Sequence, residues 1–380
     1  MDGSGLVVER CDILIVGAGV AGASLAWSLA QRESVDVVVV EQERGPAHHA
    51  SGRSARTLLE IDRNPVVRRL KIAGARFLRR PPAGFCSNPL LDVRGALRLL
   101  DRDELETVER SLTTLRDEGL ELDLLAPREA CLLCDVLDRN AFAAAVHLPH
   151  DGFIDVDGLM RGFTRGAAEH GARFHFGRRI GALEPEAEGW VVEAGDERIF
   201  ARVLVNAAGA WAGEIGSRAG CAPLRLRPLR RSLVVCAAPG GLDAARWPLV
   251  WSDAHRLYFR PLERRLMVCP MDETPSEPCD AEEDEHAIEA ALARLPRLAP
   301  RLASLRPHER WAGLRTFSDD GAPVVGFDPQ APGFFWLAGQ GGCGMETAAA
   351  LSEISADLLL EGSTARFDAS SLDPRRFHGR

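Results

Sequence analysis

Residues 12–41 read DILIVGAGVAGASLAWSLAQRESVDVVVVE, and this stretch decides the fold. Its first part, Ile13–Val16, is an apolar run suited to a parallel strand that is covered on both faces. Gly17 allows the tight turn that follows, and Gly19 lets the backbone approach a pyrophosphate. Gly22 lets the next helix pack closely on the strand. The pattern predicts a strand, a glycine turn and a helix in succession.

The rest of the stretch completes a dinucleotide-binding pattern. A helix is expected to begin near Val20, which turns its N-terminal amides and its dipole toward the phosphates. Val37–Val40 forms the second strand, and Glu41 follows where a carboxylate can accept hydrogen bonds from a ribose 2′-hydroxyl. An acid at Glu41 favours FAD or NAD over NADP, whose 2′-phosphate it would repel. The alternative is a glycine-rich strand, turn and helix that binds nothing.

The composition is that of an ordinary globular enzyme. The chain has 380 residues, which suggests two domains or one elaborated domain. Its net charge of −9 gives no basic surface for nucleic acid or an anionic membrane. Glycines interrupt the weakly apolar residues 13–30 and no basic segment precedes them, so neither a signal peptide nor a membrane span is expected. We therefore expect a cytoplasmic protein.

The cysteines and histidines do not predict a metal site. Nine cysteines are scattered along the chain, and their number is odd. Cys131 and Cys134 match CxxC but lack the setting of a thioredoxin motif and a second pair for zinc. His48 and His49 are adjacent, and the side chains of neighbours rarely point at one ion. We expect reduced cysteines and no metal.

A second strand, glycine turn and helix lies near the end of the chain. Phe334–Gly344 supplies the strand and the turn, and Met345–Leu360 is expected to be the helix. The pattern between the two glycine turns predicts mostly helix over 97–145, a helix over 159–171, strands over 173–176, 190–194 and 202–206, an antiparallel sheet within 224–270, and an acidic helix with a solvated face over 282–294.

Two such turns with a β-rich insertion between them indicate a nucleotide domain assembled from discontinuous segments. An NAD dehydrogenase needs only the first turn, whereas the second is explained if a flavin ring must also be held. The expected fold class is α/β, with a Rossmann-like nucleotide domain and a second, α+β part built on an antiparallel sheet.

Several strings of residues span nearly the whole chain in a characteristic order: Gly17–Gly22 with Glu41, Ala50–Ala55, Pro81–Cys86, Val203–Trp211, Arg230–Ser232, Trp311–Arg315 and Gly333–Gly344. This order resembles the D-amino acid oxidase/glycine oxidase family of FAD-dependent oxidoreductases, and within it the D-arginine dehydrogenase type. The resemblance implies an FAD-binding domain over residues 1–85, 146–216 and 310–380. It also implies a substrate-binding domain over 86–145 and 217–309, with the flavin between the two.

The resemblance further implies that FAD is held by several parts of the chain. The expected residues are Gly17, Gly19, Val20, Ala21, Gly22, Glu41, Gln42, Ser51, Arg53, Ser54, Ala55, Ile180, Ala208, Gly209, Trp211, Gly313, Arg315, Gly341, Gly342, Cys343, Gly344 and Met345. Relatives with covalently attached flavin carry a cysteine in the segment that matches Ala312–Thr316. No cysteine stands there in this chain, so we expect dissociable FAD.

Three residues match the substrate site of the family. Arg315 matches its carboxylate-binding arginine, and a planar guanidinium can make two charge-assisted bonds to a carboxylate. Tyr258, the only tyrosine, matches one whose hydroxyl touches the same carboxylate; the alternative is a ring that only packs on a strand. Arg231 matches another active-site arginine, and Arg230 beside it must face the other way on a strand.

Some positions depart from the arginine-type pattern. They are Arg56, Thr57, Asp62, Ala96 and Glu346. Ala96 stands where a carboxylate receives the substrate guanidinium, which argues against strict D-arginine selectivity. Glu60, Asp62 and Glu346 offer another site for a cationic group, or they are surface and helix-cap carboxylates.

The expected reaction is oxidation of a D-amino acid or related amine at the Cα–N bond to an imino acid. A neutral amine lets hydride leave for flavin N5, so the protein must chiefly hold the carboxylate and aim the Cα–H bond. Trp251, expected at the pocket wall, favours apolar or aromatic side chains. One alternative is a 2-hydroxy acid dehydrogenase, for which no histidine in the matched strings supplies the base; another is a non-catalytic flavin-binding protein. The electron acceptor (oxygen, a quinone or an electron-transfer protein) stays open.

Overall fold

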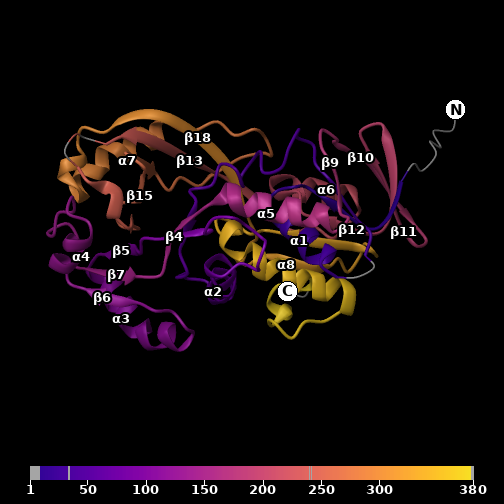
Figure 1. Ribbon diagram of the computed structural model, residues 1–380, viewed down its shortest axis with the longest axis horizontal. Coiled ribbons are helices and arrows are strands. Elements are labelled where there is room, and N and C mark those ends of the chain that lie inside the picture. Colours follow the sequence, from indigo (N-terminus) through magenta and orange to yellow (C-terminus); the bar gives the residue numbers. More distant parts are fainter. Residues whose placement is uncertain (1–8, 33–34, 239, 241, 378–380) are drawn as a thin grey trace.

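The computed structural model describes residues 9–32, 35–238, 240 and 242–377, which fold around two large β-sheets and one small one. The first large sheet and its helices form one end of the long axis, and the second sheet forms the other (Figure 1). Helix α8 (Gly344–Glu361), near the end of the chain, packs against α1 (Val20–Ala30) near its beginning. The ends of the chain therefore build the same part of the molecule.

The first sheet has eight strands in the order β10-β11-β12-β1-β2-β9, with β20 joined to β12 and β19 to β20. The strands are β1 (Glu9–Val16), β2 (Val37–Val40), β9 (Arg173–His175), β10 (Ile180–Glu186), β11 (Gly189–Ala194), β12 (Glu197–Asn206), β19 (Val324–Phe327) and β20 (Phe334–Ala338). The centre, β20-β12-β1-β2-β9, is parallel, and the other pairings are antiparallel. Helices α1, α5 (Val156–Glu169) and α8 contribute to the core on one face, and α6 (Ala212–Arg218) to the core on the other.

The second sheet has nine strands in the order β17-β13-β16-β15-β14-β5-β7-β6, with β18 beside β13. The strands are β5 (Ala96–Leu100), β6 (Asp123–Leu125), β7 (Ala144–Leu148), β13 (Arg227–Ala237), β14 (Leu249–Ser252), β15 (Leu257–Leu262), β16 (Arg265–Cys269), β17 (Thr274–Pro275) and β18 (Arg306–Phe317). Every pairing in it is antiparallel except that of β5 with β14. Helices α4 (Pro127–Leu133) and α7 (Glu285–Leu298) close the core on one face.

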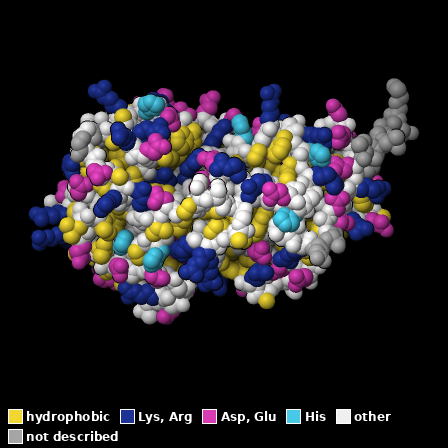
Figure 2. All heavy atoms as spheres, in the orientation of Figure 1, with side chains coloured by type: hydrophobic (Ala, Val, Ile, Leu, Met, Phe, Trp, Pro, Cys, Tyr) yellow, Lys and Arg dark blue, Asp and Glu magenta, His cyan; other side chains and the backbone are white. Residues whose placement is uncertain are grey.

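The remaining elements connect and flank the sheets. They are α2 (Pro65–Arg79), α3 (Arg102–Asp117), the small sheet of β3 (Thr57–Leu58), β4 (Leu91–Val93) and β8 (Gly152–Ile154), and the 3-10 turns η1 (Gly209–Trp211), η2 (Ala244–Arg246), η3 (Pro300–Leu302), η4 (Ala369–Ser371) and η5 (Pro374–Phe377). No helix in the part of the chain that the structure describes is long and apolar enough to cross a membrane. Basic and acidic side chains are interspersed over the face shown in Figure 2.

Gly17 and Gly22 allow the tight turn and the close helix packing that their spacing predicts. Gly17 has φ of +102°, and a Cβ there would lie 2.6 Å from the carbonyl oxygen of Ala207 on the neighbouring strand connection. A Cβ on Gly22 would lie 1.9 Å from the carbonyl oxygen of Gly17. Both contacts are closer than a side chain tolerates, so only glycine lets α1 pack this tightly on the turn.

The predicted fold class is confirmed, and two local predictions are wrong. Residues 97–145 include α3 and α4, but they also contain most of β5, all of β6 and the start of β7 in the second sheet. α7 does not simply present a solvated face, because Ile288, Ala291 and Leu295 are buried in the core of the second sheet. The domain boundaries stay a prediction. The boundary at residue 310 falls within β18, which pairs along its length with β13.

Candidate active site

A continuous cleft runs from the first glycine turn to the second. Its first hollow encloses about 960 Å³ including its open mouth and reaches from Gly17 and Glu41 to Ile180 and Trp211. Its second hollow encloses about 770 Å³ and is lined by Arg231, Arg315 and the Gly341–Met345 turn. The hollows share wall residues: Gly19, Ala50, Ser51, Arg53, Ala207, Gly209, Gly313 and Leu314. An elongated ligand can therefore occupy both.

Glu41 is held in place at the far end of the first hollow. Its Oε2 accepts a hydrogen bond from the amide of Ala18 at 2.7 Å, and its Oε1 accepts one from Glu43 at 2.9 Å. These bonds fix the carboxylate between the first glycine turn and the segment after β2. Each oxygen retains acceptor capacity for a ribose hydroxyl. Ile180 lines the same hollow, with its carbonyl oxygen accepting from Arg218 at 3.3 Å.

The middle of the cleft lies at the N-terminus of α1. Ser51 Oγ accepts a hydrogen bond from the amide of Val20 at 2.9 Å, so the residue after Ala50 caps the first turn of that helix. Arg53 crosses the cleft: its Nη1 donates to the carbonyl oxygens of Ala281 and Ala312, each at 3.2 Å, and its guanidinium pairs with Asp280. A guanidinium and a helix N-terminus make this part of the cleft favourable for phosphate.

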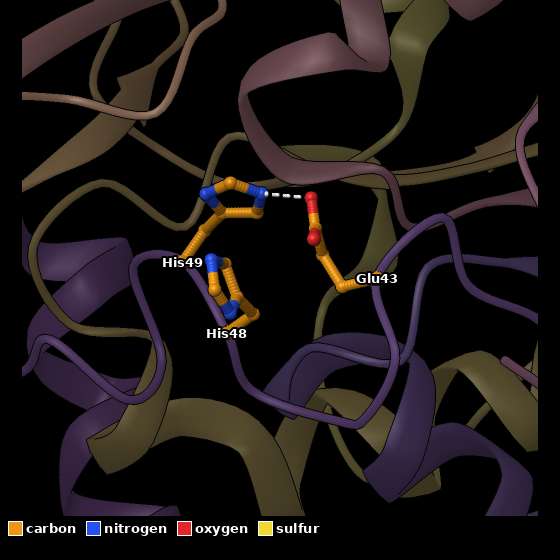
Figure 3. Close-up of side chains that lie close together, drawn as sticks. All are labelled: Glu43, His48 and His49. Carbon is orange, nitrogen blue, oxygen red and sulfur yellow. Dashed lines mark hydrogen bonds and ion pairs between the residues drawn. The ribbon is translucent and has the colours of Figure 1, made fainter. Parts of the chain in front are cut away.

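Glu43, His48 and His49 lie closer together than the sequence suggests. Figure 3 shows the three side chains close together, and the nitrogen and oxygen atoms that could bind a metal all lie within 4.8 Å of one another. His49 Nε2 lies 2.9 Å from Glu43 Oε1, and its ring packs on Trp211 with centroids 4.7 Å apart. Both histidines line the first hollow. The absence of a metal stays a prediction, but its premise that adjacent histidines point apart does not hold here.

The second glycine turn faces Arg315 across the second hollow. The amide of Gly341 donates to the carbonyl oxygen of Thr316 at 2.9 Å, which ties the turn to the end of β18. A Cβ on Gly342 would lie 2.8 Å from Arg315 Nη1, so glycine makes room for the guanidinium. Among the described residues, the guanidinium of Arg315 has no hydrogen-bond or ion-pair partner, although its backbone pairs with Leu229 on β13. A part-buried, unpaired guanidinium in a cleft is suited to an anionic ligand.

The register of the second sheet decides between Arg230 and Arg231. Arg230 lies on the α7 side, where its Nη2 is 2.6 Å from Oδ2 of Asp284, the N-cap residue of that helix. Arg231 lies on the opposite side and lines the second hollow. Its Nε donates to the carbonyl oxygen of Asp272 at 2.7 Å, and its Nη2 contacts Glu273 Oε1 at 2.5 Å. Arg231 is therefore the arginine that faces the cleft.

Tyr258 lies beside the second hollow on the same side of the sheet. It is the cross-strand partner of Cys269 and of Trp251. Burial raises the pKa of the Tyr258 phenol, the neighbouring Cys269 adds to this, and the positive charges of Arg315 and Arg231 act to lower it. The phenol is therefore protonated at neutral pH and can donate a hydrogen bond.

The carboxylates proposed as alternative cation acceptors all have partners. Glu60 pairs with Arg79. Asp62 Oδ2 lies 2.9 Å from Lys71 Nζ, and Glu346 Oε2 lies 3.5 Å from the same nitrogen. Ala96 is fully buried, in an apolar cluster against which Trp251 and Tyr258 pack.

Most of the expected cofactor and substrate residues line the cleft. They are Gly17, Gly19, Val20, Ala21, Glu41, Gln42, Ser51, Arg53, Ser54, Ile180, Ala208, Gly209, Trp211, Arg231, Gly313, Arg315, Gly341, Gly342, Gly344 and Met345. Gly22, Ala55, Cys343 and Tyr258 are not among the lining residues, and neither is Trp251, which is expected from the sequence at the pocket wall. Sequence reasoning missed His48, His49, Arg218, Cys279, Ala281 and Gln340. Cys279 and Ala281 come from the second part of the chain and carry no motif that announces them.

The cleft fits FAD. Its two hollows match the two halves of that molecule, and the α1 N-terminus and Arg53 lie where they join. The flavin end also offers polar groups without protein partners: the Arg315 guanidinium and the buried Thr316 Oγ1, which has no hydrogen-bond partner in the described part of the chain.

Comparison with known proteins agrees with this fit. Residues 12–358 match the DAO family, described as FAD dependent oxidoreductase. FAD-dependent oxidoreductase domain-containing protein 1 from Bos taurus is 26% identical over 99% of this chain and 86% of that protein. Glycine oxidase from Geobacillus kaustophilus is 25% identical over 98% of this chain and 99% of its own. The crystal structure of L-proline dehydrogenase from P. horikoshii superposes with a TM-score of 0.88 at 22% identity, covering 98% of this chain and 99% of that one.

The fold and the cleft thus define a two-part flavoprotein scaffold. The chain belongs to the DAO family of FAD-dependent oxidoreductases, and its cofactor is FAD.

Proposed function

We propose that this protein oxidises the Cα–N bond of an amino acid or related amine that carries a free carboxylate, giving an imino acid. The observation that carries the proposal is Arg315, whose guanidinium lines the flavin end of the cleft without a protein partner. A non-catalytic flavin-binding protein has no need of such a group. The similarity to glycine oxidase supports a substrate of the amino acid class.

The substrate is held by three residues, Arg315, Arg231 and Tyr258, each through a different contact. Arg315 makes the bidentate, charge-assisted contact to the carboxylate. Arg231, fixed by Asp272 and Glu273, adds positive charge on the same side of the sheet. The Tyr258 phenol, which is protonated at neutral pH, donates one further hydrogen bond. The three groups orient the Cα–H bond toward the flavin, and orientation is the main catalytic demand of this reaction.

An amine substrate suits the lining better than an alcohol. FAD supplies the hydride acceptor, flavin N5, and a neutral amine needs no further base at the α-carbon. A 2-hydroxy acid would need a base close to its hydroxyl. The described residues that line the second hollow include no histidine, aspartate or glutamate. This favours the amine over the 2-hydroxy acid.

The side chain of the substrate is expected to be neutral. Glu60, Asp62 and Glu346 are paired with basic side chains of the chain itself, and Ala96 offers no acceptor. The apolar cluster around Trp251 and Tyr258 favours an apolar or aromatic group. The D-configuration rests on the resemblance of the sequence to the D-arginine dehydrogenase type.

Anaerobic mixing with a panel of candidate substrates tests the proposal. The panel holds D- and L-amino acids, N-methyl amino acids, glycine and 2-hydroxy acids, and the flavin absorbance near 450 nm reports reduction. We expect bleaching by D-amino acids or N-alkyl amino acids with neutral side chains. Bleaching by 2-hydroxy acids alone would contradict the amine assignment, and bleaching by L-amino acids alone would contradict the D-configuration. No bleaching by any carboxylate-bearing amine would contradict the proposal itself.

A further inference from the structure

Lys71 is the only lysine of the chain, whose other basic residues are all arginine. It lies on α2, and its side chain is 8% exposed. Its Nζ lies between two carboxylates, 2.9 Å from Asp62 Oδ2 and 3.5 Å from Glu346 Oε2. A buried ammonium is costly unless it is paired, so this arrangement is a built feature of the core.

Glu346 joins this ion cluster to the flavin end of the cleft. It stands in the first turn of α8, directly after Gly344 and Met345, which line the second hollow. Its side chain is 6% exposed, and its Oε1 accepts a hydrogen bond from the amide of Leu59 at 2.7 Å. Leu59 in turn packs against the apolar cluster shared by Trp251 and Tyr258. The Glu346 carboxylate thus connects the glycine turn at the flavin end of the cleft with Leu59, which packs beside Trp251 and Tyr258.

The helices around Lys71 leave little room for adjustment. A Cβ on Gly74, one turn further along α2, would lie 1.9 Å from the carbonyl oxygen of Glu346. The backbones of α2 and α8 are therefore in direct contact beside the ion cluster. A lysine fits this space with a compact point charge, whereas the planar, wider guanidinium of arginine would have to displace one helix.

We propose that Lys71 is a positioning residue for the cofactor. Its ammonium holds the Glu346 carboxylate against the Leu59 amide and so fixes the Gly341–Met345 turn and the N-terminus of α8 at the flavin. The role is indirect, because Lys71 is not among the residues that line the second hollow.

Several charged or titratable groups surround Glu346. Lys71 on α2 and Asp62 before that helix face it, Cys343 precedes it in the turn, and Asp151 lies close enough to interact with it. Burial raises the pKa of Glu346, Asp62 raises it further, and Lys71 lowers it. Removal of Lys71 therefore leaves a buried carboxyl group whose pKa rises further above its unfolded value.

The experiment compares Lys71→Met, Lys71→Met/Glu346→Gln and Arg32→Met with the wild type. Methionine keeps the length of the lysine stem without its charge, and glutamine keeps an acceptor for the Leu59 amide. Arg32→Met is the matched control, because Arg32 pairs at 2.6 Å with Asp357, a carboxylate that is also buried on α8 but near its other end. The measurements are the Kd of the apoprotein for FAD, the absorption spectrum of bound flavin, and the apoprotein Tm from about pH 5 to about pH 8.

Lys71→Met is expected to weaken FAD binding about tenfold and to shift the flavin spectrum, because the Glu346 carboxyl group loses the ammonium that holds it and the turn in place. Its Tm should fall relative to wild type as pH rises, since the unfolded chain releases the Glu346 proton while the folded chain retains it. The double variant should recover the FAD affinity and the spectrum, and its Tm should lack the additional pH dependence of Lys71→Met. Arg32→Met should lower Tm with FAD affinity unchanged.

Two results would overturn the proposal. One is wild-type FAD affinity and spectrum in Lys71→Met, which would leave Lys71 with a role in packing alone. The other is a folded double variant that binds FAD as poorly as Lys71→Met, which would show that the charge on Glu346 is not what Lys71 controls. Where Lys71→Met alone fails to fold, the folded double variant is compared with the wild type instead, and an FAD affinity about tenfold or more below that of the wild type overturns the proposal.

Discussion

Arg230 and Arg231 are consecutive in β13 but serve opposite sides of the second sheet. Arg230 is bound to the N-cap of α7 through Asp284, and Arg231 lines the flavin end of the cleft. Alternate residues of a strand face opposite ways, so the two side chains cannot exchange roles. Exchange would require a one-residue slip in the pairing of β13 with β18, which would turn every buried side chain of the strand to the wrong face.

This relationship predicts opposite phenotypes for two neighbouring alanine variants. Arg230→Ala should lower Tm through loss of a part-buried ion pair worth about 1 kcal/mol or less, with kcat/KM nearly unchanged. Arg231→Ala should lower kcat/KM at least about tenfold, because charge is removed beside the substrate carboxylate. Steady-state kinetics and thermal unfolding of both variants check this. Loss of activity in Arg230→Ala with Arg231→Ala unaffected would contradict the assignment.

Arg315→Ala should remove the carboxylate clamp. We expect KM to rise and kcat/KM to fall. The loss of transition-state stabilisation should be ~2–5 kcal/mol, the cost of truncating one partner of a buried charged pair. Arg315→Lys should recover only part of this, because a point charge cannot reproduce the planar fork. FAD content must be measured in each variant, since Arg315 also borders the second glycine turn. Near-normal kinetics in Arg315→Ala with FAD bound would remove Arg315 from the clamp.

Features that depend on residues close in the sequence could be predicted, whereas features that depend on residues far apart in the sequence could not. Gly17, Gly22 and Glu41 act within one strand, turn, helix and strand unit, so their spacing alone indicates their roles. The segment 97–145 was predicted as mostly helix because short buried runs such as Ala96–Leu100 have no alternating pattern to mark them as strands. Their pairing with β14 and β7 settles their conformation, and no local signal reports it.

The same limit applies to the site. Asp62, Lys71 and Glu346 meet only because α2 packs on the N-terminus of α8, which lies far along the chain. The sequence therefore leaves open whether these carboxylates accept a cationic substrate or are surface and helix-cap groups, and the structure shows each with a basic partner. One signal was available: a single lysine in a chain whose other basic residues are arginine marks a position where arginine does not suffice.

FAD should be released when the protein is denatured. The part of the chain that the structure describes places no cysteine among the residues that line the second hollow. Cys343, next to that wall, is buried and donates its thiol to the carbonyl oxygen of Gln340 at 3.0 Å. Burial raises the pKa of this thiol to about 12, so it is not a nucleophile at neutral pH. After acid precipitation, the yellow colour should be in the supernatant; flavin that stays with the polypeptide would contradict this.

Substrate preference should favour neutral over cationic side chains. For an arginine side chain, the three candidate carboxylates are already paired with Arg79 and Lys71, and Ala96, buried in an apolar cluster, supplies no acceptor. Without a charge-assisted partner the arginine side chain forgoes about 1.5–3 kcal/mol. Trp251 is held by a hydrogen bond from its Nε1 to Asp253 at 3.1 Å, and Arg98 lies over its ring at 5.1 Å, which fixes the ring against the apolar cluster that it shares with Tyr258.

The test is kcat/KM for D-arginine against that for D-phenylalanine, D-methionine and D-alanine under the same conditions. We expect at least one neutral substrate to exceed D-arginine. A wild-type preference for D-arginine above about a hundredfold, which corresponds to roughly 2.7 kcal/mol, would mean that one of the paired carboxylates exchanges its partner for the substrate. In that case Asp62, the most exposed of the three at 27%, is the first to replace with asparagine.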